Sequence, residues 1–461
     1  MTTTSHLSAL AGFGGEILQP GAPAYDEARR VWNNAIDRYP SLILRCTSTA
    51  DVQAAVTHAR QTGLVIAVRA GGHSMAGLSV CDDGIVIDLT PMKDIQVDPA
   101  RRTATVQPGV IWRELDAATQ LHGLAVPGGE VSDTGVAGLT LGGGIGWLGR
   151  KHGLSCDNLR AITMITASGD VVRASGTEND ELFWGVRGAG ANFGVVTELE
   201  FDLHPVGPTI FGGELIHPGF RDYAALRFLT ARAMEVPDEV RLMAALVTAP
   251  VAPFVPPEAQ GQPVCVLAAS HCGSVEDGRT ALEPLRDFGP PVVDTLRELA
   301  YTELQQTVDQ TIPPGRSAYV KSDFLGPLDD EALQILARYH AEAPTPYCQI
   351  LLHQMGGALA KEPPGGTAFP NRDAVWMLTV AAIWIDADEP TAPLVEWARG
   401  LWREMRPWST GTYVNHLGDE GAERVREAYG ASYPRLLGLK QQWDPQNVFR
   451  LNQNIVPPLA G

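Results

Sequence analysis

The segment Arg69-Ala-Gly-Gly-His73-Ser-Met-Ala-Gly77 directly follows Val65–Val68, a short β-branched run that predicts a strand. Glycines after a strand let the chain adopt positive φ and bring main-chain N–H groups close to an anion. The segment is therefore a candidate cradle for a pyrophosphate. Taken alone, however, it is better explained as an ordinary tight turn that carries a solvated histidine.

A second glycine-rich loop changes this interpretation. It runs from Pro127-Gly-Gly129 through Gly135-Val-Ala-Gly138 to Gly142-Gly-Gly144. Two such loops in one domain can hold both ends of a long dinucleotide, because each presents main-chain N–H groups to an anion. The two loops together predict a dinucleotide cofactor.

A nicotinamide dinucleotide is the least favoured candidate for this cofactor. Gly144-Ile-Gly146-Trp-Leu-Gly149 satisfies the G-x-G-x-x-G pattern, and Asp170 lies about twenty residues further on. However, the glycine-rich residues 138–144 precede this pattern where a buried strand is required, and Ser168-Gly-Asp170 is typical of a hairpin turn. An NAD-dependent dehydrogenase is therefore kept only as the last alternative.

Composition excludes several classes of function. The 461 residues include 35 Lys and Arg against 53 Asp and Glu, which gives a net charge of −18. Such an acidic surface repels phosphate backbones and anionic lipids, so neither nucleic acid nor a membrane is expected as a partner. The six cysteines have no spacing that would close a zinc site, and no metal is expected. Without a signal-peptide pattern, reduced thiols predict a cytoplasmic protein.

Two patterns of secondary structure meet near residue 205. Before it, short strands (65–68, 85–89, 103–106) alternate with helices, one of which is predicted from a capping box at Ser48 to a stop at Gly63. After Pro205, longer strands are predicted over 241–247, 263–270, 347–354 and 376–385, with helices over 329–339 and 394–405. This second pattern predicts a separate α+β unit with helices on one face of a sheet.

Four motifs together resemble the berberine-bridge-enzyme-like branch of the vanillyl-alcohol-oxidase flavoprotein superfamily. They are Arg69-x-Gly-Gly-His73-Ser, Gly135-Val-Ala-Gly-x-Thr-Leu-Gly-Gly-Gly144 with Gly146-Trp147, Asn192-Phe-Gly-Val-Val196, and Trp443-Asp-Pro-x-Asn-Val-Phe449. They occur in the family's order and are spread over almost the full chain.

The resemblance implies an α+β, two-domain fold of the p-cresol-methylhydroxylase (PCMH) type. Residues 1–204 would form the FAD-binding domain, and residues 205–410 an inserted substrate domain, an antiparallel sheet covered by helices. Residues 411–461 would return to the first domain. The change of pattern near Pro205 agrees with this division.

The resemblance also implies how FAD is held. In the family, the histidine of the first loop is bonded covalently to the 8α-methyl of the flavin, and here that residue is His73. Imidazole nitrogens are nucleophilic near neutral pH, so the reaction is chemically reasonable. The other expected FAD-binding residues are Arg69, Gly71, Gly72, Ser74, Gly77, Pro127, Gly128, Gly135, Gly138, Leu141, Gly142, Gly143, Gly146, Val195 and Asn415.

A second covalent link is not expected. Many relatives form one from a cysteine in a Gly-x-Cys-Pro-x-Val-Gly segment, and Val131 stands at that position here. Cys156, in Gly-Leu-Ser-Cys-Asp-Asn158, is expected to pack instead.

The proton acceptor for substrate oxidation is predicted in the tail. The Glu that some relatives carry after a Gly-Gly pair is absent from Gly356–Lys361. Other relatives use a tyrosine in Tyr-x-Asn-Tyr, which here becomes Tyr413-Val-Asn415-His416. Because a phenol with pKa near 10 needs stabilising donors and an imidazole near 6.5 does not, both Tyr413 and His416 are candidates.

The resemblance implies an FAD-dependent oxidoreductase, with oxidase the first interpretation. It would transfer a hydride from an alcohol or amine carbon of a sugar, alkaloid or secondary metabolite to the flavin, and then pass the electrons to O2. Thr134 stands where relatives line the oxygen path, and its Val-like shape favours an oxidase. A tryptophan-rich substrate domain would suit an aromatic ligand or a stacked sugar, although core packing explains these tryptophans more simply. A dehydrogenase with poor O2 reactivity and a flavin-binding protein without significant turnover remain alternatives.

Overall fold

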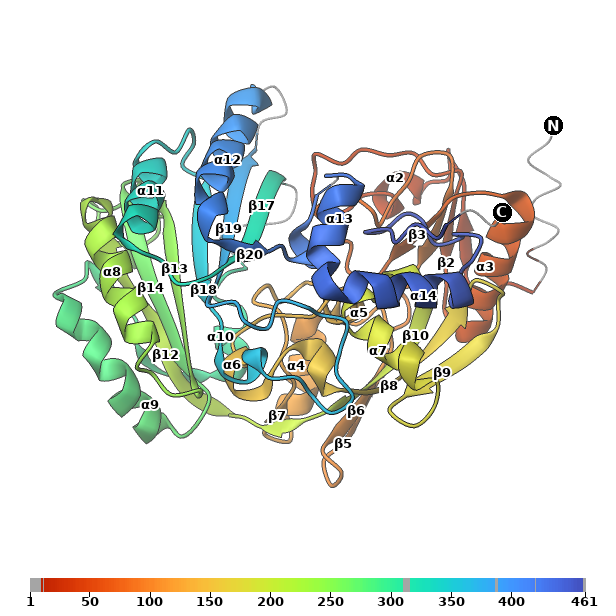
Figure 1. Ribbon diagram of the computed structural model, residues 1–461, viewed down its shortest axis with the longest axis horizontal. Helices are drawn as coiled ribbons and strands as arrows, with labels where there is room; N and C mark the ends of the chain where they lie inside the picture. The colour runs from red at the N-terminus through yellow and green to blue at the C-terminus, as the bar shows by residue number, and fades with distance from the viewer. Residues whose placement is uncertain (1–9, 11, 310–315, 386–388, 419, 459–461) are drawn as a thin grey trace.

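The computed structural model describes residues 10, 12–309, 316–385, 389–418 and 420–458. It is an elongated α+β molecule with two lobes (Figure 1). The first lobe holds the N-terminal part of the chain and the C-terminal tail, and the second holds the segment between them. No helix within the described ranges is long and apolar enough to cross a membrane.

A four-stranded sheet with the order β1-β2-β4-β3 begins the first lobe. Its strands are β1 (Glu16–Leu18), β2 (Leu42–Arg45), β3 (Ile66–Arg69) and β4 (Ile85–Asp88), and a short helix α2 (Tyr25–Ala28) lies between the first two along the chain. Helix α3 (Thr49–Thr62) packs its buried alanines and valines against this sheet. The Ser48 side chain accepts a hydrogen bond from the Asp51 N–H, and Gly63, at φ 72°, ends the helix as predicted.

A five-stranded antiparallel sheet with the order β5-β6-β10-β8-β9 completes the first lobe. Its strands are β5 (Ile95–Asp98), β6 (Thr103–Val106), β8 (Leu159–Thr166), β9 (Val171–Ser175) and β10 (Gly194–Asp202). The helices of this lobe are α4 (Trp112–Gln120), α5 (Val136–Leu141), α6 (Gly149–His152), which contacts β13 (Val240–Thr248) of the second lobe, and α7 (Asp180–Ala189). Asp170 lies in the β8–β9 turn, and helix α5, not a strand, precedes the G-x-G-x-x-G pattern, so both arguments against a nicotinamide fold are confirmed.

The second lobe is built on a nine-stranded antiparallel sheet with the order β15-β12-β14-β13-β18-β19-β17-β20, in which β16 also pairs with β12. The strands are β12 (Thr209–Pro218), β13 (Val240–Thr248), β14 (Pro263–His271), β15 (Val293–Asp294), β16 (Arg297–Ala300), β17 (Ser317–Leu325), β18 (Gln349–Gln354), β19 (Trp376–Trp384) and β20 (Ser409–Gly411). The two-stranded pair β7 (Leu124–Ala125) and β11 (His204–Pro205) lies where the chain enters this lobe.

Helices cover only one face of the large sheet, as the sequence predicted (Figure 1). These are α8 (Asp222–Ala233), α9 (Val275–Leu282), α11 (Asp330–Ala341) and α12 (Thr391–Met405), while α10 (Tyr301–Leu304) packs on α4 of the first lobe. Side chains alternate along a strand, so Leu378, Val380 and Ala382 of β19 face the helices and their neighbours in the chain face the first lobe.

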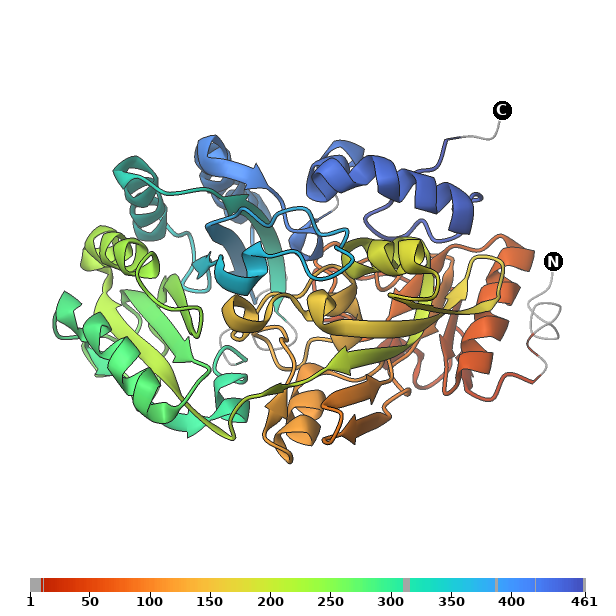
Figure 2. The ribbon, with the colours of Figure 1, turned by 60° about the horizontal axis from the view of Figure 1, so that its bottom comes forward.

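The C-terminal tail returns to the first lobe. Helices α13 (Ala422–Tyr429) and α14 (Tyr433–Trp443) place Val425, Tyr429 and Leu436 in one core with Leu182 and Phe193. Figures 1 and 2 both show these helices, in blue, lying against that lobe. Strand β20 pairs with β17 and spans the predicted boundary at residue 410; the boundaries 1–204, 205–410 and 411–461 stay predictions.

Candidate active site

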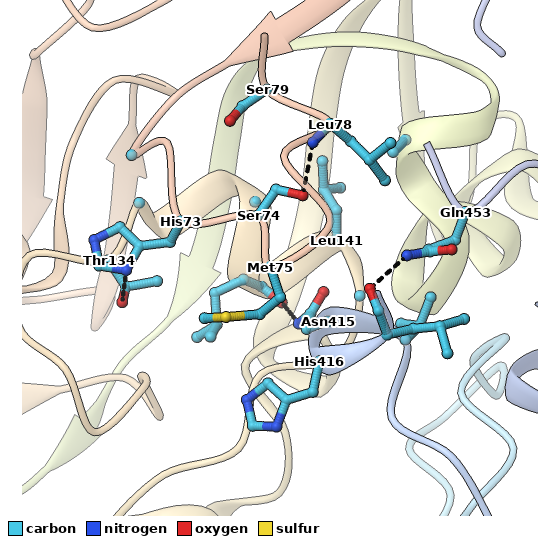
Figure 3. Close-up of a pocket in the computed structure, with 18 of the residues that line it drawn as sticks. His73, Ser74, Met75, Leu78, Ser79, Thr134, Leu141, Asn415, His416 and Gln453 are labelled. Carbon is cyan, nitrogen blue, oxygen red and sulfur yellow. Dashed lines mark hydrogen bonds between the residues drawn. The ribbon is translucent and has the colours of Figure 1, made fainter. Parts of the chain in front are cut away.

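A cavity of about 400 Å³ lies between the two lobes. On one side is a cofactor wall, which we define as residues 70–74 of the first loop and 129–142 of the second. On the other is a sheet wall, which we define as Ala318, Val320, Leu351, His353, Met377, Thr379, Ala381 and Ile383 of β17–β19. The tail contributes residues 413–417 and 451–453 to the same cavity. Figure 3 shows first-loop and tail side chains around it.

The two glycine-rich loops touch through their backbones. A Cβ atom at Gly71 would lie 2.2 Å from the Gly135 main-chain nitrogen, and one at Gly135 would lie 2.5 Å from that of Gly71. A Cβ at Gly138 would meet nothing within 4 Å, although Gly138 lines the cavity. Glycine is therefore required for loop contact at the first two positions, and it leaves space for a ligand at the third.

The first loop has unpaired donors. Among the described residues, none accepts a hydrogen bond from the main-chain N–H groups of Gly71, Gly72, His73 or Ser74. Gly72 has φ +73°, which only glycine adopts readily, and the Ser74 hydroxyl accepts a bond from the Leu78 N–H that closes the loop. Successive free N–H groups in such a turn can bind an anion, as the sequence suggested.

His73 has a polar neighbour at each ring nitrogen. Its Nε2 lies 3.1 Å from Asp133 Oδ1. Its Nδ1 lies 3.4 Å from the Thr134 hydroxyl oxygen (Figure 3). The Trp32 ring stacks on the imidazole at a centroid distance of 5.1 Å. His73, Thr134 and Trp32 all line the cavity, so the imidazole is at its surface.

Tyr413 is buried at the junction of the loop and the tail. Its hydroxyl accepts hydrogen bonds from the Gly144 N–H at 3.0 Å and from Asn415 Nδ2 at 2.9 Å. Burial raises the pKa of this phenol more than those two donors lower it. The resting side chain is therefore a protonated phenol that still has its own proton to donate.

His416 lies beside Tyr413, with 5.0 Å between the ring centroids, and its Nδ1 is 3.4 Å from the Thr379 hydroxyl. Burial and, to a smaller extent, the charge of His353 together lower its pKa to about 4, against a weaker opposite effect of Glu130. The His416 ring is therefore neutral at pH 7 and can accept a proton.

Several predicted FAD-binding residues lie outside the cavity lining. Arg69 forms a buried ion pair with Asp88, with 2.6 Å from Nη2 to Oδ2, and also donates to the Ala28 carbonyl oxygen. Gly146 packs so closely that a Cβ would lie 1.9 Å from the Gly128 carbonyl oxygen. The predicted residues in this group are Arg69, Gly77, Pro127, Gly128, Gly143 and Gly146. Their positions indicate support of the loops; contact with FAD stays a prediction.

The remaining predicted residues line the cavity together. They are Gly71, Gly72, His73, Ser74, Gly135, Gly138, Leu141, Gly142, Val195, Tyr413, Asn415 and His416. Val131 and Thr134 also line it, whereas no cysteine does so among the described residues. Cys156 is fully buried in an apolar cluster with Tyr413, as its packing interpretation predicted.

The sequence interpretation missed a charged cluster at the end of the sheet wall. Glu130 Oε2 lies 3.2 Å from His353 Nδ1, and its Oε1 lies 3.2 Å from Nη2 of the fully buried Arg241. Burial by itself would raise the pKa of Glu130, but His353 and Arg241 outweigh it and lower the pKa to about 2. Glu130 and His353 both line the cavity.

A signal for this cluster was present in the strand pattern. Ile350 and Leu352 of β18 are buried among the helices, which places His353 on the opposite face of the sheet. A polar residue in the alternating position of an otherwise apolar strand is a candidate for a site. That Glu130 and Arg241 meet it could not be foreseen, because they come from different lobes.

The tryptophans of the second lobe do not line the cavity, so core packing, the interpretation that the sequence favoured, is confirmed, and the alternative of an aromatic ligand or a stacked sugar is wrong. Trp376, Trp384 and Trp397 are buried in the helix-covered core. Trp402 is surrounded by three cationic side chains. Among the described residues, the one tryptophan that lines the cavity is Trp32 of the first lobe. The described part of the chain has no group of three or more His, Cys, Asp or Glu that could hold a metal ion.

Two family models match the chain at its two ends. The model described as an FAD binding domain matches residues 40–175, and the model described as berberine and berberine like matches residues 412–456. The first match covers the cofactor wall, and the second covers the part of the tail that lines the same cavity.

Known relatives extend over the whole chain. An FAD-linked oxidoreductase of Dictyostelium discoideum is 32% identical over 96% of this chain and 95% of its own. (R)-6-hydroxynicotine oxidase of Paenarthrobacter nicotinovorans is 32% identical over 98% of this chain and 99% of its own. The crystal structure of 6-hydroxy-D-nicotine oxidase from Arthrobacter nicotinovorans superimposes with a TM-score of 0.87 at 29% identity, covering 96% of this chain and 98% of that one.

Proposed function

We propose that this chain, which belongs to the berberine-like family of FAD-linked oxidoreductases, is an oxidase of small alcohols or amines that holds FAD through a single covalent bond to His73. The observation that carries the proposal is the shared cavity, which joins the glycine-rich cofactor wall to the sheet wall. Tyr413, His416 and His353 line the same cavity, where they can contact a substrate.

The cofactor wall has the chemistry that FAD requires. The free N–H groups of residues 71–74 suit a pyrophosphate, and the open side of Gly138 leaves room for the bound molecule. His73 is at the cavity surface and Val131 stands at the cysteine position, which supports one link instead of two. FAD held by these residues would supply a hydride acceptor for a substrate carbon and an electron donor for O2.

The protein has to remove the proton that accompanies this hydride. His416 is neutral at pH 7 because its pKa is lowered to about 4, so it can accept a proton from a substrate O–H or N–H. The protonated phenol of Tyr413, oriented by Gly144 and Asn415, can hold the reacting oxygen or nitrogen in place. His353 is oriented by Glu130 and completes the polar end of the cavity.

The sheet wall favours a compact substrate with few polar groups. Six of its eight residues are aliphatic or Met, and its polar members are His353 and Thr379. A sugar oligomer buried there would leave most hydroxyls without hydrogen-bond partners, which costs about 1–3 kcal/mol for each group. We therefore infer a small cyclic amine or alcohol, a class in which the 6-hydroxynicotine of the relative's name also falls.

We propose O2 as the electron acceptor. Thr134 lines the cavity beside His73, and it stands where a Val is common in the oxidases of the family. We also propose a cytoplasmic location, which is supported by six buried cysteines that form no disulfide.

Three measurements test the proposal. The purified protein should be yellow after acid precipitation, and His73→Ala should lose this retained colour whereas the matched control Cys156→Ala keeps it. A panel of cyclic amines, simple alcohols and sugar oligomers should reduce the bound flavin without oxygen, with amines or alcohols ahead of sugars. Admitting O2 should reoxidise the flavin and produce hydrogen peroxide.

Different results would point to different errors. Flavin released from the wild type by acid would exclude the covalent link. Reduction without rapid reoxidation would indicate a dehydrogenase with another acceptor. Failure of every compound in the panel would favour a flavin-binding protein without turnover.

A further inference from the structure

Asp133 and Thr134 stand in a short segment that is fixed on both sides. The Ser132 N–H and hydroxyl donate to the Asp309 carboxylate at 2.8 and 2.6 Å. The Arg113 and Trp112 N–H groups donate to the carbonyl oxygens of Ser132 and Thr134. The segment therefore holds the side chains of Asp133 and Thr134 beside His73 in a defined position.

These two side chains distinguish the nitrogens of His73. Asp133 Oδ1 is 3.1 Å from Nε2, and the Thr134 hydroxyl is 3.4 Å from Nδ1. Asp133 Oδ1 is buried, and no donor among the described residues makes an aligned hydrogen bond with it, so Nε2 is its nearest partner. The side chain of His73 is 13% exposed and that of Asp133 is 24% exposed, so the contact between them is largely shielded from water.

The charge state of the carboxyl group follows from its neighbours. Burial alone would raise the pKa of Asp133, but His73 and the charge of Arg113 outweigh it and hold the pKa below its usual value. An ionised carboxylate beside Nε2 favours the tautomer with its proton on Nε2, because the proton is then shared with an acceptor. The lone pair is then on Nδ1.

We propose that Asp133 is a positioning residue for the attachment of FAD, which holds the Nε2 proton of His73 so that Nδ1 forms the bond to the 8α carbon. This inference rests on the proposed link through His73. A carboxylate that orients an imidazole and stabilises its positive charge is the arrangement that makes histidines effective in catalytic triads.

The chemical balance of the step explains why a carboxylate helps. The Nδ1–C8α bond forms, one C8α–H bond breaks, and the carbon is oxidised by two electrons that pass through the flavin to O2. Alkylation at Nδ1 leaves a positive charge on the ring, which the adjacent carboxylate stabilises until the Nε2 proton leaves. The hydrogen from the methyl group and the proton from the imidazole complete one molecule of hydrogen peroxide.

The test follows the appearance of acid-resistant flavin after FAD is added to the full-length apoprotein in air. Asp133→Asn should bind FAD but attach it at least tenfold more slowly, because an amide cannot stabilise the positive ring. Asp133→Glu should recover part of the rate. Ser132→Ala is the matched control: it weakens the same segment without touching His73, and it should attach FAD at close to the wild-type rate.

The wild-type protein provides a second measurement that needs no variant. NMR of the flavin peptide isolated after proteolysis should show the bond at Nδ1. A bond at Nε2, or attachment in Asp133→Asn within twofold of wild type, would overturn the inference and leave the link itself intact. An equal loss in Ser132→Ala would assign the effect to loop rigidity and also overturn it. Flavin released by acid from the wild type would instead remove the underlying link.

Discussion

The two walls of the cavity are made in different ways. The cofactor wall is mainly backbone: glycines bring two loops into contact, and the main-chain N–H groups of residues 71–74 have no acceptor among the described residues. The sheet wall is made of side chains that alternate along β17–β19. A glycine-rich loop is a local sequence motif, whereas the face of the sheet on which a strand side chain lies depends on the register of the whole sheet. One wall can therefore be recognised in the sequence, and the other cannot.

The largest expected effect comes from substitutions in the tail, which adds Tyr413 and His416 to the cavity between the two walls. His416→Gln should slow anaerobic flavin reduction by about 10²- to 10⁴-fold, the range typical of a lost general base. Tyr413→Phe, which removes a positioning hydroxyl, should slow it by roughly tenfold, which corresponds to a hydrogen bond of about 1.4 kcal/mol. Stopped-flow absorbance with the best substrate measures both. The reverse order would assign the proton acceptor to Tyr413.

The next effect tests the charged cluster that links the walls. Glu130→Gln leaves the fully buried Arg241 without its counter-charge, which should lower the free energy of unfolding by about 3 kcal/mol. The matched control is Glu181→Gln, whose pair with Arg435 is exposed and should contribute less than about 1 kcal/mol. Urea denaturation monitored by circular dichroism provides both values. If both variants lose the same free energy of unfolding, the buried pair of Glu130 and Arg241 stabilises the protein no more than an exposed ion pair does.

A pair of glycine substitutions tests the cofactor wall itself. Gly71→Ala forces a Cβ against the Gly135 backbone and should destabilise the protein by about 1–3 kcal/mol and weaken FAD binding. Gly138→Ala has open space around its Cβ, so it should keep the stability of the apoprotein while weakening FAD binding alone. Thermal melts with and without FAD separate the two effects. If Gly138→Ala leaves FAD binding unchanged, the cofactor does not occupy this part of the cavity.

The smallest effect concerns the contact between the lobes beneath the cavity. Asp116 of α4 is buried, receives a hydrogen bond from Gln305 Nε2 at 3.0 Å, and has an Oδ1 atom with no hydrogen-bond partner in the described part of the chain. Burial raises its pKa to about 7, against the weaker opposite effect of Gln305. The folded protein therefore keeps this proton after the unfolded chain has lost it, so stability should fall between about pH 4 and pH 7 and level off above.

Asp116→Asn should flatten that slope and stabilise the protein at pH 8 by on the order of 1–2 kcal/mol. The new amide can also donate to Gln305 Oε1, which has no hydrogen-bond partner among the described residues. Unfolding free energies at pH 4.5 and pH 8 measure the change. A variant that is less stable than wild type at pH 8 would contradict the raised pKa.

Most of the fold could be predicted because its signals are local. The Ser48 cap, the Gly63 stop and the hairpin at 168–170 each depend on a few neighbouring residues. For the same reason, the glycine-rich loops at 69–77 and 127–144 could be found in the sequence and predict a dinucleotide site. The interpretation of the second-lobe tryptophans as core residues is confirmed for Trp376, Trp384 and Trp397. The sequence could not exclude the alternative of ligand binding, because 3.6- and 2-residue periods reveal which residues share a face, but not which face meets the cavity.

The sequence by itself determined the elements and the glycine-lined loops, since backbone conformation is encoded locally, and its resemblance to the family identified the candidates His73, Tyr413 and His416. Only the tertiary structure decided that Glu130, Arg241 and His353 meet at one end of the cavity and that Asp133 faces His73. It also decided that Arg69 pairs with Asp88 outside the cavity. The reason is physical: charges from distant segments find one another only after sheet register and lobe packing have removed them from water.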